Sequence, residues 1–453
     1  MTRALLRFNT RAFLSVRKYR NYRLFFLGQS VSLPGTWIQR AAQAWLILTL
    51  THSALAVGML AFAQFLPFTL FSLVAGVVVD RLDSHKIVKA TQTAFMVIAA
   101  ALAAVTLAGV VEPWEVYVAA LLGGLVQVID SPARQQLTYR MVGRDTLQNA
   151  VALNSSVFNA SRIYGPGLAG VLIAAFGVGI CFAINAVSFL AVLAGLIMMR
   201  PSEFFPIEAS RRPRLIGGIR EGLSYVYHSR ELVLVLGLVL VIATMSLNFN
   251  VLLPVLARQT LHSHSITFGL LSASFGFGAL AGGLVAAGQG RARRSFMLIG
   301  AVGFGGSQVL LAAERSIWLS CLLLVLAGVS FTTWSSNSNS IVQLSAPDHL
   351  RGRVLGLYLF AYAGTGSFGG LFAGWLVHVG GTTLAFLVSG LAALAGTAVV
   401  ARLLIREHAG RRPLTQARER VAGLRFSTRP SSHPPSRPMP PVESFTAAVR
   451  SPK

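Results

Sequence analysis

The chain has 453 residues, of which 54% are hydrophobic and only 12% are charged. A soluble protein carries about 25% charged residues to solvate its surface, so this composition excludes a soluble globular protein and predicts an integral membrane protein. A net charge of +24 would indicate nucleic-acid binding in a soluble chain, but in a membrane protein basic residues also set the topology.

Twelve apolar runs follow one another along the chain, each about 20 residues long, which is the length of a helix that spans a bilayer. The sequence therefore predicts an all-α integral membrane protein with twelve transmembrane helices. The predicted helices are 23–50, 54–79, 87–110, 114–131, 148–176, 179–199, 231–257, 266–288, 295–313, 316–344, 353–377 and 382–404.

These runs divide the chain into five parts. A basic N-terminal arm, 1–22, precedes a bundle of six helices, 23–200, and a basic linker, 201–230, leads to a second bundle of six, 231–405. The tail, 406–453, is rich in proline and serine, a composition typical of disordered segments.

Lysine and arginine lie almost entirely in the N-terminal arm, in every second connection and in the tail. Only Arg258 and Arg315 lie on the opposite side, and Arg23, Arg40 and Arg162 lie within helices. Because basic residues stay on the cytoplasmic side of membrane proteins, both termini are predicted to be cytoplasmic. The multi-pass chain is expected in the inner (cytoplasmic) membrane, without a nucleic-acid partner.

The two bundles are expected to be homologous repeats. A shift of 204 residues maps the fifth predicted helix onto the eleventh, and internal repeats of this kind are common in transporters. The glycines that this shift pairs are Gly165 with Gly369, Gly170 with Gly374, and Gly177 with Gly381. The predicted fold is therefore two pseudo-symmetric six-helix bundles.

Four stretches resemble the major facilitator superfamily, in the branch that contains the enterobactin exporter and macrolide efflux proteins. They are 22–58, 66–86, 131–170 and 343–358, and the resemblance covers nearly the whole chain up to about residue 405. It implies a secondary transporter that needs no cofactor, works as a monomer in the lipid bilayer and carries its substrate between the two bundles.

A gating motif is implied at the cytoplasmic end of the second helix, where Gly76, Asp80 and Arg81 resemble the family signature GxxxDR. Gly76 lets a neighbouring helix approach closely, and Asp80 can accept hydrogen bonds from a helix N-terminus or pair with an arginine. Arg351 and Arg353 are the candidate partners. The alternative is a loop acid among basic neighbours. The second half lacks the acid, so asymmetric gating is expected.

The fifth helix carries Gly165, Pro166 and Gly170, which resemble a family signature associated with export. Pro166 removes a backbone donor and permits a kink, and the glycines allow tight packing against the other half. Ordinary helix packing is the alternative interpretation of these three residues.

Polar side chains form stripes along five of the predicted helices. An arginine at mid-bilayer costs about 2.5–3.5 kcal/mol, so we expect Arg40 to face a hydrated substrate cavity. Each polar residue alone can also serve to hold helices together. The candidate cavity residues are Gln29, Ser32, Thr36, Arg40, Gln43, Ser155, Asn159, Arg162, Thr244, Asn248, Trp334, Asn337, Asn339, Tyr358 and Tyr362.

The sequence gives two indications of the energy source of transport. No GxxxxGK[ST] loop is present, which argues against ATP hydrolysis by this chain, and the family resemblance implies protons. Many relatives carry an aspartate where this sequence has Thr36. The acid well inside the apolar runs is Asp130, which is either the proton carrier or a structural partner of Arg134 or Arg140.

The predicted function is secondary active export of an amphipathic small molecule, siderophore-like or drug-like, by alternating access in exchange for protons. The alternatives are an uptake permease of the same fold and a membrane receptor or assembly factor without transport. The sequence shows no catalytic triad and no metal-ligand cluster, so neither an enzyme nor a metal site is predicted.

Overall fold

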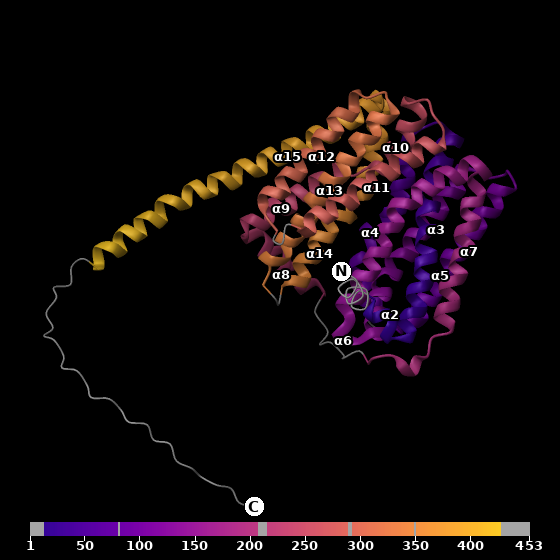
Figure 1. Ribbon diagram of the computed structural model, residues 1–453, viewed down its shortest axis with the longest axis horizontal. Helices are drawn as coiled ribbons and strands as arrows, with labels where there is room; N and C mark the ends of the chain where they lie inside the picture. Colours follow the sequence, from indigo (N-terminus) through magenta and orange to yellow (C-terminus); the bar gives the residue numbers. More distant parts are fainter. Residues whose placement is uncertain (1–12, 80–81, 207–214, 289–291, 348–349, 427–453) are drawn as a thin grey trace, which may run out of the picture. The chain divides into compact units, whose positions relative to one another are not determined.

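The structure, a computed structural model, describes residues 13–79, 82–206, 215–288, 292–347 and 350–426 (Figure 1). These residues form helices with short connections, and none of them lies in a strand. The chain divides into two units, Met1–Ala401 and Arg402–Lys453. The predicted tail overlaps the second unit, whose described residues, 402–426, are helical.

Residues 13–206 form the first half of the larger unit (indigo to magenta in Figure 1). In this half, α3 packs against α6 and α7, and α5 packs against both of them. The elements are α2 (Leu14–Lys18), α3 (Arg20–Thr51), α4 (Ala54–Val79), α5 (Ser84–Leu107), α6 (Pro113–Phe176), α7 (Val178–Ile197) and the 3-10 turn η1 (Pro201–Glu203).

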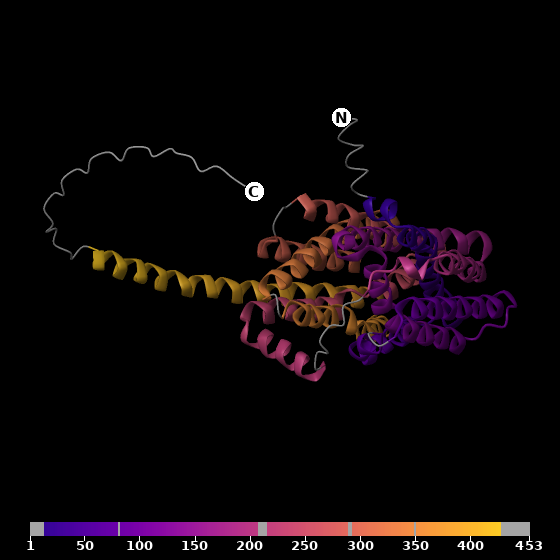
Figure 2. The same cartoon turned by 90° about the horizontal axis from the view of Figure 1, so that it is seen from below.

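Residues 215–401 form the second half, which lies beside the first in both views (Figures 1 and 2). Three short π-helical segments, η2 to η4, interrupt its helices. The elements are α8 (Leu215–His228), α9 (Arg230–Val241), η2 (Ile242–Ser246), α10 (Phe249–Val255), η3 (Leu256–Thr260), α11 (Ser265–Gly288), α12 (Arg294–Ala313), α13 (Ile317–Ser345), α14 (Arg351–Leu359), η4 (Phe360–Gly364) and α15 (Gly366–Phe426).

Nine helices within the described ranges are long and apolar enough to cross a membrane, against twelve predicted runs. Two of the nine each cover two predicted runs. The first is α6, which continues through a kink at Gly143, and the second is the span Arg351–Ile405, in which α14, η4 and α15 follow one another and α15 continues through a kink at Gly380 and Gly381. The first predicted run lies within α3, which is not among the nine. Its arginines and glutamines lower its hydropathy below that of its neighbours.

The glycines paired by the 204-residue shift have equivalent surroundings. Gly177 and Gly381 both have positive φ, 81° and 71°, a conformation that glycine adopts without steric cost. Gly165 approaches Trp37 of α3, and its counterpart Gly369 approaches the Thr244 carbonyl of η2. Helix contacts therefore repeat between the two halves.

The surface of the helices is apolar, as expected of chains surrounded by lipid rather than water. Leu284 is 77% exposed and Phe277 is 64% exposed. Trp114 and Trp318 occupy equivalent places at the starts of α6 and α13, and both are largely exposed. Tryptophan is enriched at the membrane interface, so these two rings mark one face of the bilayer.

Described residues of the predicted N-terminal arm and of the predicted linker pack against the two bundles. Ser15 of α2 is buried, and its hydroxyl donates to the Thr146 carbonyl at 3.2 Å. The described part of the predicted linker includes the helix α8, whose Tyr225 donates to the Ser345 carbonyl at 3.0 Å. The ends of both bundles are thus held by side-chain hydrogen bonds.

Candidate functional site: a cavity between the two halves

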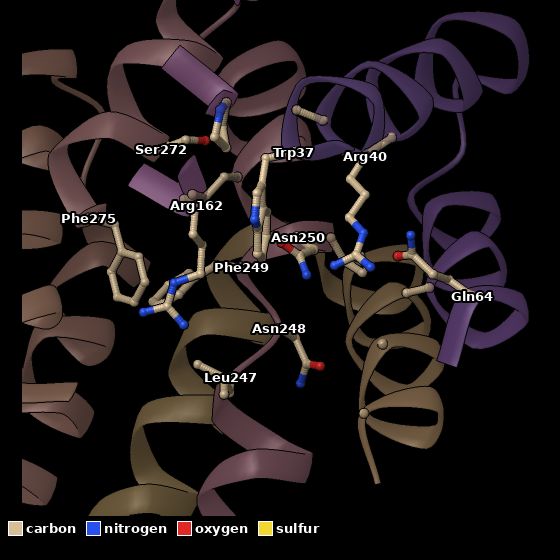
Figure 3. A pocket seen from close by; sticks show the side chains of 18 of the residues that line it. Trp37, Arg40, Gln64, Arg162, Leu247, Asn248, Phe249, Asn250, Ser272 and Phe275 are labelled. Carbon is tan, nitrogen blue, oxygen red and sulfur yellow. The ribbon is translucent and has the colours of Figure 1, made fainter. Parts of the chain in front are cut away.

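A cavity of about 350 Å³ lies between the two halves of the larger unit. Figure 3 shows side chains from both halves pointing into it. The volume is in the range of small-molecule pockets. Its walls come from α3, α4 and α6 of the first half and from η2, α10, α11, α13, η4 and α15 of the second.

Aromatic rings form much of the wall. Trp37 and Phe158 of the first half meet edge to face with ring centroids 5.6 Å apart. In the second half Phe275 lies 4.7 Å from Phe249 and 5.7 Å from Phe331, centroid to centroid. Such rings offer broad apolar contact to a ligand.

Polar groups interrupt this wall at a few places. The Arg40 guanidinium lies over the Trp37 ring at 5.2 Å, and that of Arg162 lies over the Phe331 ring at 5.8 Å. None of the described residues that line the cavity is acidic. The lining residues with polar side chains other than tryptophan are Arg40, Gln43, Gln64, Arg162, Asn248, Asn250, Ser272 and Tyr362. The cavity is therefore amphipathic and cationic.

Five of the predicted cavity residues line the cavity: Arg40, Gln43, Arg162, Asn248 and Tyr362. The other predicted residues do not line it. They are Gln29, Ser32, Thr36, Ser155, Asn159, Thr244, Trp334, Asn337, Asn339 and Tyr358.

Contacts within one bundle account for four of these ten residues. Gln29 accepts a hydrogen bond from Arg134, and Asn337 accepts one from the Arg293 backbone at 3.0 Å. Trp334 and Tyr358 are buried against other side chains. These residues therefore act as links within a bundle, which was the alternative interpretation for each polar residue.

The prediction omitted Trp37, Gln64 and Phe158, which all line the cavity. Trp37 precedes Arg40 by three residues and so shares its helix face, a signal that the sequence contained. Gln64 is the one strongly polar side chain in the apolar run 54–68. Phe158 carries no comparable signal, because phenylalanine is as common on lipid-facing surfaces.

Asp130 lies outside the cavity, fully buried in the first half. Its carboxylate accepts hydrogen bonds from Thr91 at 2.6 Å, from Gln92 at 2.9 Å and from the Arg134 Nε at 3.0 Å. Arg134 also forms the ion pair with Asp130. Of the two structural partners considered, the contact is thus with Arg134 and not with Arg140.

Arg140 instead pairs with Asp83, with a distance of 3.1 Å between Nη1 and Oδ2. Partial burial acts to raise the pKa of the Asp83 carboxyl, but hydrogen bonds from the Lys86 backbone and from Arg140 outweigh it and lower that pKa. The same carboxylate also accepts from the His85 backbone and so caps the N-terminus of α5.

The predicted gating motif is only partly visible. Gly76 lies in α4, whereas Asp80 and Arg81 lie outside the described residues. Arg353 forms an ion pair with Glu221 of α8, and the Arg351 Nε donates to the Gln343 carbonyl at 3.3 Å. The pairing of Asp80 with either arginine therefore stays a prediction.

The two halves meet at the end of α3, which we call the Arg258 end. The Arg258 guanidinium of η3 donates to the Thr49 hydroxyl at 3.0 Å and lies 5.6 Å from the Trp45 ring centre. Gln259 donates to the His52 carbonyl at 3.1 Å. These contacts join the halves beside the cavity.

Glycines let the helices of the two halves touch. A Cβ on Gly170 would lie 2.5 Å from the Ser265 carbonyl oxygen and 2.8 Å from the Gly269 Cα of α11. On the symmetry-related side, a Cβ on Gly374 would lie 3.0 Å from the Gly58 Cα of α4. Pro166 lines the cavity, and Gly165 packs against Trp37 within the first half. Of the two motif glycines, Gly170 is the one that contacts the other half.

Replacing Arg258 with glutamine is expected to loosen the Arg258 end. The change removes a cation–π contact and a charged hydrogen bond, together worth about 1–2 kcal/mol. The ratio of molecules whose halves are apart at the Arg258 end to molecules whose halves touch there should therefore rise about tenfold. Spin labels at the exposed His52 and His262 should report a longer distance. Arg315→Gln, an exposed arginine, should leave the distance unchanged. Equal distances in both variants would contradict the role of Arg258.

Comparison with known proteins agrees with this architecture. A family model described as a transmembrane secretion effector matches residues 13–428. The multidrug efflux pump Tap of Mycolicibacterium fortuitum is 29% identical over 369 residues, which cover 79% of this chain and 89% of that protein. The staphyloferrin A transporter of Staphylococcus aureus is 25% identical over 346 residues, covering 74% and 84%.

Solved structures share the fold at low sequence identity. A POT family transporter in complex with 5-aminolevulinic acid has a TM-score of 0.68 at 11% identity, with 84% of this chain and 96% of that chain covered. The nucleoside transporter NupG has a TM-score of 0.62 at 14% identity, with 85% and 98% covered. The chain therefore belongs to the transmembrane secretion effector family of the major facilitator superfamily, and is a multi-pass transporter of the cell membrane rather than an enzyme.

Proposed function

We propose that this chain exports an amphipathic small molecule across the cell membrane by alternating access, working as a monomer. The observation that carries the proposal is the amphipathic cavity between two halves that touch at the Arg258 end. A substrate held there contacts both halves, so movement of one half against the other can expose it to either side.

Export is favoured over uptake by two features. One relative named above is a multidrug efflux pump, and a macrolide efflux protein A of Streptococcus pyogenes is 24% identical over 353 residues, which cover 76% of this chain and 86% of that protein. The name of the staphyloferrin A transporter gives its substrate but not its direction. Drug-like and siderophore-like molecules are accordingly the substrate classes proposed. The GPxxxG motif of α6, with Gly170 at the contact between the halves, is the second feature.

The proposed topology follows from the basic residues. Arg293, Arg353 and the described basic residues near the start of α3 lie on the side proposed to be cytoplasmic, together with both termini. The Arg258 end then faces outward, and Arg258 and Gln259 join the two halves on that side.

Proton exchange is the proposed energy source, with Asp130 as the carrier. Its carboxylate is the acid most deeply placed among the described membrane helices, but it is paired with Arg134. Arg134 occupies the carboxylate in this conformation, so exchange of a proton there requires Arg134 to move away during the transport cycle. Gln29, which Arg134 also contacts, offers it an alternative acceptor.

Proteoliposomes with an imposed pH gradient and an internal pH dye test this proposal. We expect a catecholate or hydroxamate siderophore, a macrolide or a lipophilic ion to elicit proton movement, and Asp130→Asn to abolish it. Asp145→Asn, an exposed acid on the same helix α6, is the matched control. Substrate flux without proton movement would contradict the proposal of proton exchange. The absence of flux for every compound would favour the alternative of a membrane receptor without transport.

A further inference from the structure

Arg40 and Arg162 carry two positive charges into the cavity, and no acidic residue lines it within the described part of the chain. We propose that the substrate is an amphipathic organic anion whose acidic groups pair with these two arginines. The inference rests on the proposed transport function and narrows its substrate to one charge class.

The surroundings of these two arginines differ from those of several others in the chain. Elsewhere several described arginines are matched by a carboxylate: they are Arg134 with Asp130, Arg140 with Asp83, Arg200 with Glu203, Arg294 with Glu231, and Arg353 with Glu221. In the cavity, Arg40 instead faces the Trp37 ring. Arg162 faces the Phe331 ring and hydrogen-bonds the Tyr362 hydroxyl, which is not a carboxylate.

A ring is a weaker partner for a guanidinium than a carboxylate, which can accept two parallel hydrogen bonds. A cationic cavity also repels a cationic ligand, and the low dielectric of the membrane interior strengthens both effects. A ligand that brings its own negative charge satisfies both arginines. A neutral or cationic ligand leaves them without an anionic partner.

The remaining wall fits the uncharged part of such a ligand. Trp37, Phe158, Phe249 and Phe275 provide apolar ring surface, and Asn250 adds a group that can both donate and accept hydrogen bonds. Arg162 belongs to the first half, whereas its ring partner Phe331 belongs to the second. An anion bound by Arg162 therefore lies where the two halves meet, as alternating access requires.

Three pyrene probes test the charge class, because they share one apolar body and differ in the head group. They are 1-pyrenesulfonate, 1-pyrenemethanol and a pyrenyl trimethylammonium salt. Energy transfer from tryptophan to pyrene reports binding to the full chain in nanodiscs, since Trp37 lines the cavity. We expect the sulfonate to bind at least about tenfold more tightly than the other two probes.

Arg40→Gln and Arg162→Gln should each reduce the preference for the sulfonate about tenfold, while Arg40→Lys and Arg162→Lys should retain most of it. Arg23→Gln, an exposed arginine on the same helix α3, should leave it unchanged. Equal binding of the three probes, no binding of the sulfonate, or a preference that survives both glutamine variants would overturn the inference.

The transport assay in proteoliposomes distinguishes a failure of the anion assignment from a failure of the proposed transport function. A chain that moves lipophilic cations or macrolides but shows no preference for the sulfonate would overturn the anion assignment and leave transport itself intact. A chain that shows the preference, with its loss in the arginine variants, but moves no compound would support the assignment of the binding site and count against transport.

Discussion

Replacing Gly170 with leucine is expected to force the two halves apart at the contact between α6 and α11. The new side chain would meet the Ser265 carbonyl oxygen and the Gly269 Cα, which are backbone atoms of α11 and cannot turn away as a side chain would. Overpacking of this kind costs about 1–3 kcal/mol or more. The population of the conformation in which α6 and α11 touch should therefore fall about tenfold to a hundredfold. The transport rate should fall as well.

Spin labels at His52 and His262 measure this effect directly. The distance between them should lengthen in Gly170→Leu and remain as in the parent chain in Gly123→Leu, because nothing lies within 4 Å of a Cβ on Gly123 of the same helix. Gly374→Leu should repeat the result through the symmetry-related contact of α15 with α4. An unchanged distance in a folded Gly170→Leu chain would refute the assigned role of this glycine.

Replacing Arg134 with leucine is expected to destabilise the chain by about 3 kcal/mol. Asp130 is fully buried, and loss of its cationic partner leaves an uncompensated carboxylate inside the first half. Asp130→Asn should cost less, because an amide oxygen can still accept from Thr91 and Gln92. The double replacement of Asp130 and Arg134 by leucine should recover part of the loss, since no buried charge then remains.

Thermal unfolding in detergent ranks these variants. Arg140→Leu is the matched control, because its ion pair with Asp83 is partly exposed and is worth about 1 kcal/mol or less. We expect the unfolding temperature of the Arg134→Leu variant to lie clearly below that of the Arg140→Leu variant. The reverse order would contradict the structural role assigned to the pair of Asp130 and Arg134.

The helices were largely predictable, because a run of about 20 apolar residues leaves few structural choices in a bilayer. The ends of the helices were less predictable than their positions along the chain. The basic stretch between the fourth and fifth predicted helices looks like a loop, yet α6 continues through it with a kink at Gly143. Hydropathy falls where the chain leaves the lipid, but the backbone is free to remain helical beyond that point.

The cavity was predictable only in part, because helix periodicity gives the face of a residue but not the helix that covers that face. Gln29 and Arg40 share one stripe of α3, yet Gln29 contacts Arg134 of α6 and Arg40 reaches the cavity. The aromatic wall could not be separated from lipid-facing rings by sequence alone. Trp37 could have been predicted to line the cavity, because it lies about one helical turn before Arg40 and shares its helix face.

Accumulation of substrate in inside-out membrane vesicles tests the central claim most directly, since export from the cell corresponds to uptake by such vesicles. Ser272 of α11 lines the cavity, and Ser272→Trp would fill it, whereas Leu270→Trp places the same ring on the exposed side of that helix. We predict that the parent chain and Leu270→Trp accumulate substrate and that Ser272→Trp does not. Equal accumulation by all three chains, or by none, would contradict export through this cavity.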